Sequence, residues 1–485
     1  MAEFRFIVPQ AISADRRIWD SAYITGLEGI PWQSDRRFQS GQFIIGREID
    51  ESGKIHILWP TRVCGDVCLS TTSLPVGAPP FHLPVELARG TVHRLKSQLD
   101  AWQRIGLRLP DTFFPLCEAS VQGFLAAVSL HRDDSAAQTE SALAAIESAV
   151  EAIGVMCSAY ANQALEARLS QEGRLNTLIG AHVQSDAAWD VVRSRRDAIS
   201  LLSIDAHLGR LEAASGNATA WEWVDQQVDW ALQQELKICM GPLFDLTRLP
   251  QWMLMLEQDA ASLTESACAF AEKTVQRYRG RVHLWNCGSG LNLRTSLGWS
   301  DEQVLRTAVA LIETVRKTDP HTPVLLTISE PWGEYLRDDA EGISPLHFAD
   351  ALIRADLGLS GIALEMNIGA WPVGTYPRDL VELHRLIDRW ALLGVPLMVS
   401  LGYTPSTPDS YAKHPPGGTP SAPPHPAAPR ALLGSLIAKP AIHAVAWKSL
   451  DEAAPHGEAP SAAPLASDLN DALTTAAELR GKYLE

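Results

Sequence analysis

Several features that mark specialised proteins are scarce in this sequence. The seven cysteines are odd in number and scattered, and the closest pair, Cys64 and Cys68, lacks the second pair that a zinc site needs. Lys and Arg (41) are outnumbered by Asp and Glu (57), which gives a formal net charge of -16. We therefore expect neither nucleic acid nor an anionic membrane as a partner, since both bind clustered cations.

Long apolar runs and a secretory leader are also missing from the pattern. No run reaches the roughly 18 apolar residues of a membrane span. The first ten residues, MAEFRFIVPQ, lack the basic segment followed by an apolar core that marks a signal peptide. Together with the scattered thiols, this predicts a cytoplasmic location.

The sequence does contain a globular composition and many tryptophans. A hydrophobic content of 46% and a charged content of 20% are typical of a folded globular chain. A length of 485 residues is too great for one ordinary core, so two or three domains are expected. The 15 Trp residues fit stacking on flat partners such as sugar rings, although packing in a core is the alternative.

Residues 1–90 are predicted to form a β-rich, sandwich-like module. Short apolar segments alternate there with turn residues, and the DESG segment at 50–53 is typical of a hairpin turn. Residues 91–175 follow, and the apolar spacing around them predicts a long helical hairpin whose faces serve packing. The expected strands are 4–8, 41–49, 54–60 and 67–74, and the expected helices are 85–107 and 139–169.

Residues 176–485 alternate short apolar segments with helical ones. Eight such units over about 300 residues predict an α/β fold, the (β/α)8 TIM barrel. The competing doubly wound sheet would carry a glycine-rich phosphate turn, but Gly288 and Gly290 lack a third glycine. A Pro-rich loop at about 403–430 is predicted to be extended, as a flap or a tolerated insertion. The expected strands are 178–183, 198–204, 236–244, 281–285, 323–329, 361–367, 395–401 and 441–447.

In a (β/α)8 barrel the functional residues lie where the strands end. Here those ends carry carboxylates, imidazoles and indoles. Acids above an aromatic floor suit glycoside chemistry, because the acids handle the proton and the oxocarbenium charge while indoles stack on sugar rings. The strand-end positions are His182, Asp205, His207, 242–245, 285–290, Glu330, Trp332, Glu365, Asn367, 400–403, Trp447 and Lys448.

From about residue 178 to 450 the chain resembles glycoside hydrolase family 10, the endo-β-1,4-xylanases. Leu249-Pro250-x-Trp252 is similar to the family's Leu-Pro-x-Trp at strand three, and VQRYRGRVHLW (275–285) resembles its approach to strand four. GIALEMN (361–367) and AIHAVAW (441–447) fall where strands six and eight end. The order and spacing of these landmarks imply a xylanase-like barrel.

The resemblance also implies a loss. Counting from Trp285, the family's Asn-Glu pair, whose Glu is the acid/base, falls on Ser289 and Gly290. The nucleophilic Glu falls on Ser400, and His207 stands where the family has a sugar-binding Lys. Neither Gly nor an isolated Ser replaces a carboxylate in this chemistry, so both matched catalytic positions are substituted.

We therefore predict a relocated catalytic pair, Glu330 and Glu365. Adjacent strands lie about 4.8 Å apart, and glycosidase carboxyl pairs lie roughly 5–9 Å apart. Alternatively, each Glu is a buried acid satisfied by a neighbouring donor. No metal and no cofactor are expected. The predicted substrate-binding residues are Asp205, His207, Trp285, Asn286, Trp332, Asn367 and Trp447.

Three functional hypotheses follow from these residues. The first is a divergent glycoside hydrolase acting on a β-linked glycan or oligosaccharide. The second is a catalytically inactive carbohydrate-binding or scaffold protein on a xylanase-like barrel. The third is another reaction on a sugar-like substrate, such as a lyase or isomerase that uses Asp205, His207 and the two Glu residues.

Overall fold

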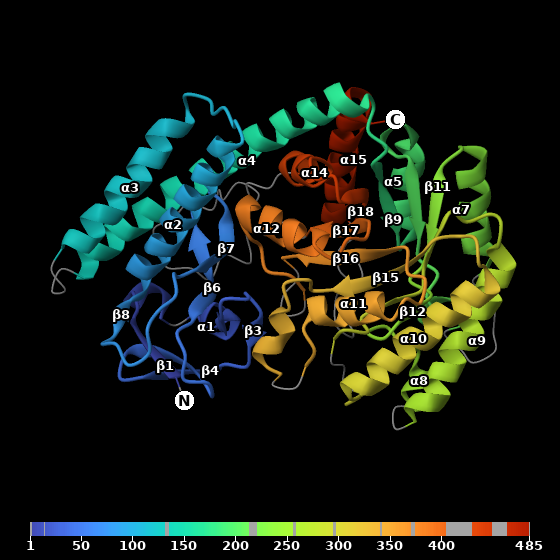
Figure 1. The fold of residues 1–485 in the computed structure, drawn as a ribbon, viewed down its shortest axis with the longest axis horizontal. Coiled ribbons are helices and arrows are strands. Elements are labelled where there is room, and N and C mark those ends of the chain that lie inside the picture. Colours follow the sequence, from blue (N-terminus) through green and yellow to red (C-terminus); the bar gives the residue numbers. More distant parts are fainter. Residues whose placement is uncertain are drawn as a thin grey trace.

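Eight parallel strands between residues 178 and 448 close into a barrel (Figure 1). Each strand pairs with its neighbours in sequence, and the last strand returns to pair with the first. This confirms the predicted (β/α)8 architecture. The strands are β9 (Leu178–Val183), β10 (Leu201–Ile204), β11 (Lys237–Met240), β13 (Leu284–Asn286), β15 (Val324–Ser329), β16 (Gly361–Ile368), β17 (Leu397–Tyr403) and β18 (Ile442–Lys448).

The computed structural model describes most of the chain. The Pro-rich loop predicted at about 403–430 lies almost entirely outside the described residues. The described ranges are 2–13, 15–130, 135–212, 221–255, 259–293, 297–339, 342–369, 374–403, 429–448 and 463–484.

Helices cover the outside of the barrel. α10 (Asp301–Thr318) begins at a capping box, in which Ser300 Oγ accepts the N–H of Gln303 and the Gln303 side chain accepts the N–H of Ser300. These bonds satisfy two backbone donors that a helix start leaves free. The other long outer helices are α5 (Asp186–Ser194), α7 (Trp221–Gln233), α9 (Ala260–Tyr278), α11 (Pro345–Arg354), α12 (Leu380–Ala391), α14 (Pro429–Ile437) and α15 (Ala463–Tyr483).

Side chains alternate between the two sides of every barrel strand. The outward set, which includes Ile238, Leu326 and Val445, packs beneath the helices in the main core. The inward set is layered, because apolar residues occupy the first half of the strands and polar residues follow at their carboxyl ends. The apolar inner cluster consists of Leu178, Leu201, Cys239, Leu284, Leu325, Ala363, Met398, Ala444 and Ala446.

The N-terminal module consists of two four-stranded sheets, ordered β4-β5-β1-β8 and β3-β2-β6-β7. The predicted hairpin at 50–53 is wrong. β5 pairs with β1 and β4, whereas β6 pairs with β2 and β7, so this turn carries the chain from one sheet to the other. The strands are β1 (Ala2–Ile7), β2 (Tyr23–Thr25), β3 (Pro31–Trp32), β4 (Asp35–Gln39), β5 (Gln42–Arg47), β6 (Lys54–Thr61), β7 (Gly65–Ser70) and β8 (Phe81–His82).

Three helices, rather than the two expected, lie between this module and the barrel. They are α2 (Leu83–Arg104), α3 (Phe113–Ser129) and α4 (Ser135–Glu172). α3 falls between the two predicted helices. Its apolar side chains are spread around the helix, and Phe114 and Leu125 are exposed, so no single apolar stripe marked it in the sequence.

α4 is the one described helix that is long and apolar enough, by length and composition, to cross a membrane. Within its most apolar window, 50% of the residues are buried in the protein. Ile153 and Met156 belong to the core shared with the barrel, and a core helix passes the same test. In Figure 1, α4 runs from the N-terminal part to the barrel and α15.

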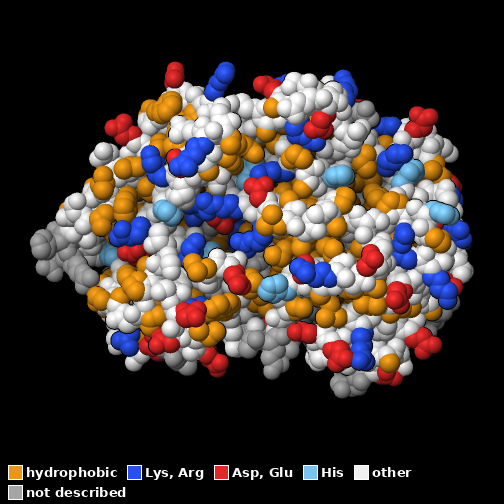
Figure 2. Space-filling model, in the orientation of Figure 1, with side chains coloured by type: hydrophobic (Ala, Val, Ile, Leu, Met, Phe, Trp, Pro, Cys, Tyr) orange, Lys and Arg blue, Asp and Glu red, His pale blue; other side chains and the backbone are white. Residues whose placement is uncertain are grey.

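Buried ion pairs fix the N-terminal part against the barrel. Arg94 of α2 donates from Nε and Nη2 to Asp379 Oδ2 at 3.0 and 2.6 Å, and both side chains are almost wholly buried. Arg378 donates to the Tyr23 hydroxyl at 2.6 Å and lies 3.1 Å from Glu334. On the outer face in Figure 2, by contrast, acidic and basic side chains are interspersed among apolar ones.

Replacing Arg94 with Met should destabilise the protein by about 3–5 kcal/mol, because the Asp379 carboxylate would stay buried without its cation. The matched control is Arg104→Met, which breaks an exposed pair with Asp100 and should cost less than about 1 kcal/mol. Urea unfolding measures both. Equal losses would contradict the assigned role of the buried pair.

Candidate active site

Alternation along the strands gathers polar side chains at the carboxyl end of the barrel. The strand register places Ser203 beside His182 and places Glu365 between Ser329 and Ser400. The inward polar residues at this end are His182, Ser203, Asp205, Asn286, Thr327, Ser329, Glu365, Asn367, Ser400 and Lys448.

Glu365 is the carboxylate at the centre of this group. Lys448 Nζ donates to one of its oxygens, and Ser329 Oγ donates to the other at 2.6 Å. Burial opposes ionisation of Glu365, but the Lys448 ammonium and these hydrogen bonds hold its pKa below the ordinary value. Glu365 is therefore ionised at neutral pH, with its side chain 21% exposed.

A second charged group surrounds Arg248. Its Nη1 donates to Asp205 Oδ2 at 3.0 Å, and its Nε donates to Asp245 Oδ2 at 2.7 Å. His207 Nδ1 lies 2.9 Å from the other oxygen of Asp205. Burial would raise the pKa of both carboxyls, but Arg248 and His207 hold the pKa of each below its ordinary value. Both aspartates are thus ionised and fixed in place.

His182 is a neutral member of the lumen. Its Nδ1 lies 2.7 Å from Ser203 Oγ. Burial lowers the pKa of His182 to about 4, although the Asp205 carboxylate acts in the opposite direction. The His182 imidazole is therefore neutral near pH 7, with one ring nitrogen as a hydrogen-bond donor and the other as an acceptor.

Glu330 stands one residue beyond β15, at the start of a turn in which Gly333 N–H donates to the Glu330 carbonyl at 2.7 Å. Its φ of +48° lies in the left-handed region, where strain often accompanies function. Burial and then the neighbouring Glu334 raise the pKa of Glu330 to about 8, against the opposing effects of Arg337 and the Gly374 N–H. Glu330 is therefore protonated at neutral pH.

The tryptophans do not form the predicted floor of the site. Trp285 is fully buried on the outer side of β13, where its Nε1 donates to Asp319 at 3.0 Å. Trp447 is likewise buried under the helices. Alternation explains both corrections, because each Trp is adjacent in sequence to an inward residue. Trp332 packs against the main core, with the Arg378 guanidinium 4.7 Å from its ring centre.

The predicted asparagines do face the lumen. Asn286 Nδ2 donates to Thr327 Oγ1 at 2.8 Å. The Oδ1 atoms of Asn286 and Asn367 are buried with no hydrogen-bond partner among the described residues. Such acceptors favour a ligand that brings its own donors, such as a sugar hydroxyl.

Gly290, where the resemblance places an acid/base Glu, has no room for a side chain. Its φ is +71°, and a Cβ there would lie 2.8 Å from Thr247 Cγ2. Thr247 is held in place because its Oγ1 and N–H donate to Asp245 Oδ1 at 2.6 and 2.9 Å. Ser289 is buried beside it, with its Oγ 3.3 Å from that of Ser329. The left-handed backbone and the Thr247 side chain together therefore disfavour a side chain at this position.

Asp245, Arg248 and Lys448 belong to this site but were not among the predicted catalytic or substrate-binding residues; Asp245 and Lys448 were named only as strand-end positions, and Arg248 was not named. Asp245 and Lys448 carried a usable signal, since each is a charged residue at the end of an apolar strand. Arg248 lies in a loop 43 residues beyond Asp205, and only the fold joins them. Within the described ranges, no group of three or more His, Cys, Asp and Glu side chains is arranged to hold a metal ion.

No protein-family model and no curated protein matches this chain. Among solved structures it is similar to xylanase 10B from Thermotoga petrophila, crystallised with xylobiose, at 15% identity and a TM-score of 0.43 over 59% of this chain and 85% of that one. It is also similar to the Thermobacillus composti GH10 xylanase, at 15% identity and a TM-score of 0.44 over 64% and 99% of the two chains. Likenesses this distant carry no conclusion about activity, and the closed strand order establishes the barrel independently.

Gly290→Ala should destabilise the protein by about 2–4 kcal/mol, because it combines left-handed strain with overpacking against Thr247. Gly298→Ala is the matched control, since Gly298 has a similar φ of +64° and open space around it. That control should cost only the strain, about 1–2 kcal/mol. Equal losses in urea unfolding would show that Thr247 does not close the position.

Proposed function

We propose that the barrel is a divergent glycoside hydrolase in which Glu330 is the general acid and Glu365 is the ionised partner. One observation carries the proposal. Two carboxyl groups at the ends of neighbouring strands have their pKa values driven apart, to about 8 for Glu330 and below the ordinary value for Glu365. Opposite shifts of this kind are what an acid and its ionised partner in one site would show, and the charge of Glu365 is among the influences that raise the pKa of Glu330.

The roles follow from the protonation states. Protonated Glu330 donates its proton to the glycosidic oxygen as the bond to the anomeric carbon breaks. The Glu365 carboxylate faces the developing oxocarbenium charge and either attacks the anomeric carbon or takes a proton from the attacking water. Lys448 and Ser329 position Glu365 and keep it ionised.

The substrate is proposed to be a β-linked glycan or oligosaccharide. This class follows the sequence resemblance, while the lumen supplies hydrogen-bonding groups suited to sugar hydroxyls. Asp205, His207, Asn286 and Asn367 are the proposed binding residues. With Trp285 and Trp447 turned outward, polar contacts rather than stacking would dominate binding.

A second candidate is a sugar-binding protein without turnover. It is favoured by the saturation of the lumen carboxylates, since both oxygens of Glu365 and those of Asp205 and Asp245 already accept hydrogen bonds or contact cations. These three carboxylates can still accept hydrogen bonds from sugar hydroxyls, but none of them is left without a partner to act as a base.

Glu330→Gln and Glu365→Gln should each lower kcat on aryl glycosides or xylo- and gluco-oligosaccharides by at least about a hundredfold, because each removes one proton-transfer or charge-stabilising group. Glu302→Gln is the control, since Glu302 is an exposed surface residue on α10. Sugar binding by calorimetry without turnover in the wild type would favour the second candidate. If the wild type neither binds nor hydrolyses any of these sugars, both candidate functions are contradicted.

The pH profile of kcat/KM should be bell-shaped. Activity should fall as the pH rises through about 8, because Glu330 then loses the proton it must donate. It should also fall at acid pH as Glu365 becomes protonated. Lys448→Met should raise the pKa of Glu365 and move only the acid limb to higher pH. An alkaline limb that persists in Glu330→Gln would belong to another group.

A further inference from the structure

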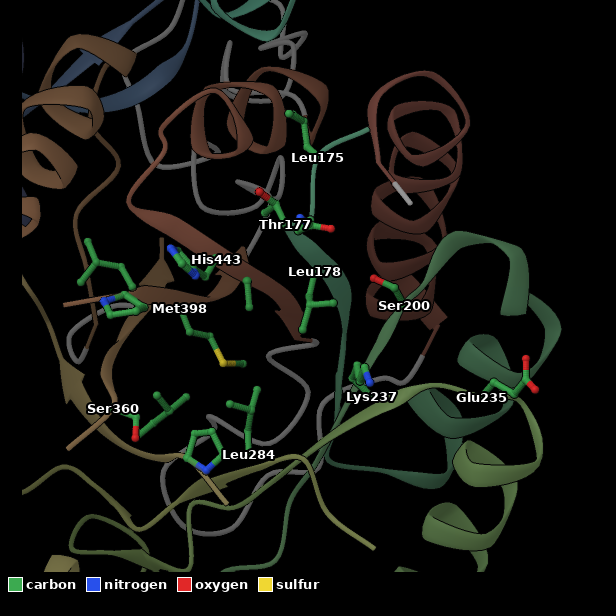
Figure 3. A pocket seen from close by; sticks show the side chains of 16 residues that line it. Leu175, Thr177, Leu178, Ser200, Glu235, Lys237, Leu284, Ser360, Met398 and His443 are labelled. Carbon is green, nitrogen blue, oxygen red and sulfur yellow. The ribbon is translucent and has the colours of Figure 1, made fainter. Parts of the chain in front are cut away.

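The opposite end of the barrel holds a cavity separate from the polar site. Its volume is about 600 Å³, within the range of small-molecule pockets, and Figure 3 shows the side chains around it. It lies among the first residues of the strands, where Leu178, Leu284, Leu325 and Met398 line it. Met398, Leu178 and Leu284 point into the open space.

Small side chains explain why this end is hollow. A closed eight-stranded barrel is normally filled by large branched residues. Here Ala444 lines the cavity, and the inner apolar cluster next to it includes the small residues Cys239, Ala363 and Ala446. That cluster also separates the cavity from the Glu365 network, so the two ends of the barrel are chemically independent.

Lys237 is the cation at the rim of the cavity. It lies at the start of β11, is exposed, and forms no ion pair with any residue that the structure describes. Burial lowers the pKa of His283, and the nearby Lys237 ammonium lowers it further, so the charge of Lys237 acts on its surroundings. Glu235, the acid on the same rim, points away from the cavity in Figure 3.

Two hydroxyls of the rim are already engaged, whereas the exposed His443 imidazole also lines the opening (Figure 3). Ser200 Oγ accepts the N–H of Ile179 at 3.1 Å, and Ser360 Oγ accepts the N–H of Val324 at 3.2 Å. Both hydroxyls therefore serve the backbone at the strand starts. The rim thus presents the unpaired Lys237 ammonium and the His443 imidazole beside an apolar chamber, in a protein whose net charge is -16.

We propose that this cavity binds a medium-chain carboxylate, with the alkyl chain inside the barrel and the carboxylate at Lys237. Apolar walls stabilise the chain by removing its methylene groups from water. Lys237 is the only Lys or Arg among the residues that line the cavity, and its ammonium favours an anionic head group over a neutral one. The site is distinct from the proposed sugar site and does not depend on it.

Calorimetric titration of the full chain with decanoate tests the head group. We expect one binding site, and about tenfold weaker binding for Lys237→Met, as for the loss of one charged hydrogen bond. Lys317→Met, which removes an exposed lysine on α10, should bind like the wild type. Decan-1-ol should bind Lys237→Met and wild type equally. Absence of decanoate binding, or equal binding by both lysine variants, would overturn the proposal.

Carbon-13 labelling of the methionine methyl groups tests the location. Decanoate should shift the Met398 signal, assigned by its loss in Met398→Leu, and leave the other methionine signals in place. Ala444→Phe fills the cavity and should abolish decanoate binding. If this variant does not fold, the location is tested by the Met398 methyl shift in the wild type alone. A shift confined to other methionines would place the ligand elsewhere and contradict the proposal.

Discussion

Closure of the eight-stranded sheet is the constraint on which the rest of this structure depends. Once the barrel closes, each strand residue faces either the lumen or the surrounding helices, and its neighbour faces the opposite way. Trp285 lies under the helices while Asn286 faces inward. Trp447 and Lys448 divide in the same way. The chemical character of the site is thus set by one-residue differences in position.

Electrostatic compensation then shapes the lumen. Asp205, Asp245 and Glu365 are buried or nearly so, and a buried carboxylate is tolerated only with a cation or several donors beside it. Arg248 and Lys448 supply that charge. Glu330 differs, because its nearest strong influence after burial is another acid, Glu334. A protonated acid therefore follows the end of β15, the strand that neighbours β16 and its ionised Glu365.

The N-terminal module bears on the same region. The N–H of Ser34, next to β3, donates to the Arg337 carbonyl at 3.0 Å. Arg337 lies in the loop between β15 and α11 that begins with Glu330. Arg378 contacts Tyr23 of the module and Glu334 of that loop. The module therefore supports the loop that carries the proposed general acid.

The sequence by itself determined the barrel and its eight strands and placed Glu365 at a strand end, because short apolar runs between helical segments are a local pattern. Through the resemblance it also predicted that no carboxylate stands at Gly290, and the structure adds that Thr247 lies close to that position. The tertiary structure alone decided the pairing of Glu365 with Lys448, the Arg248 network and the passage of the 50–53 turn between two sheets. These features join residues far apart in the chain, and no local spacing encodes which distant partners will meet.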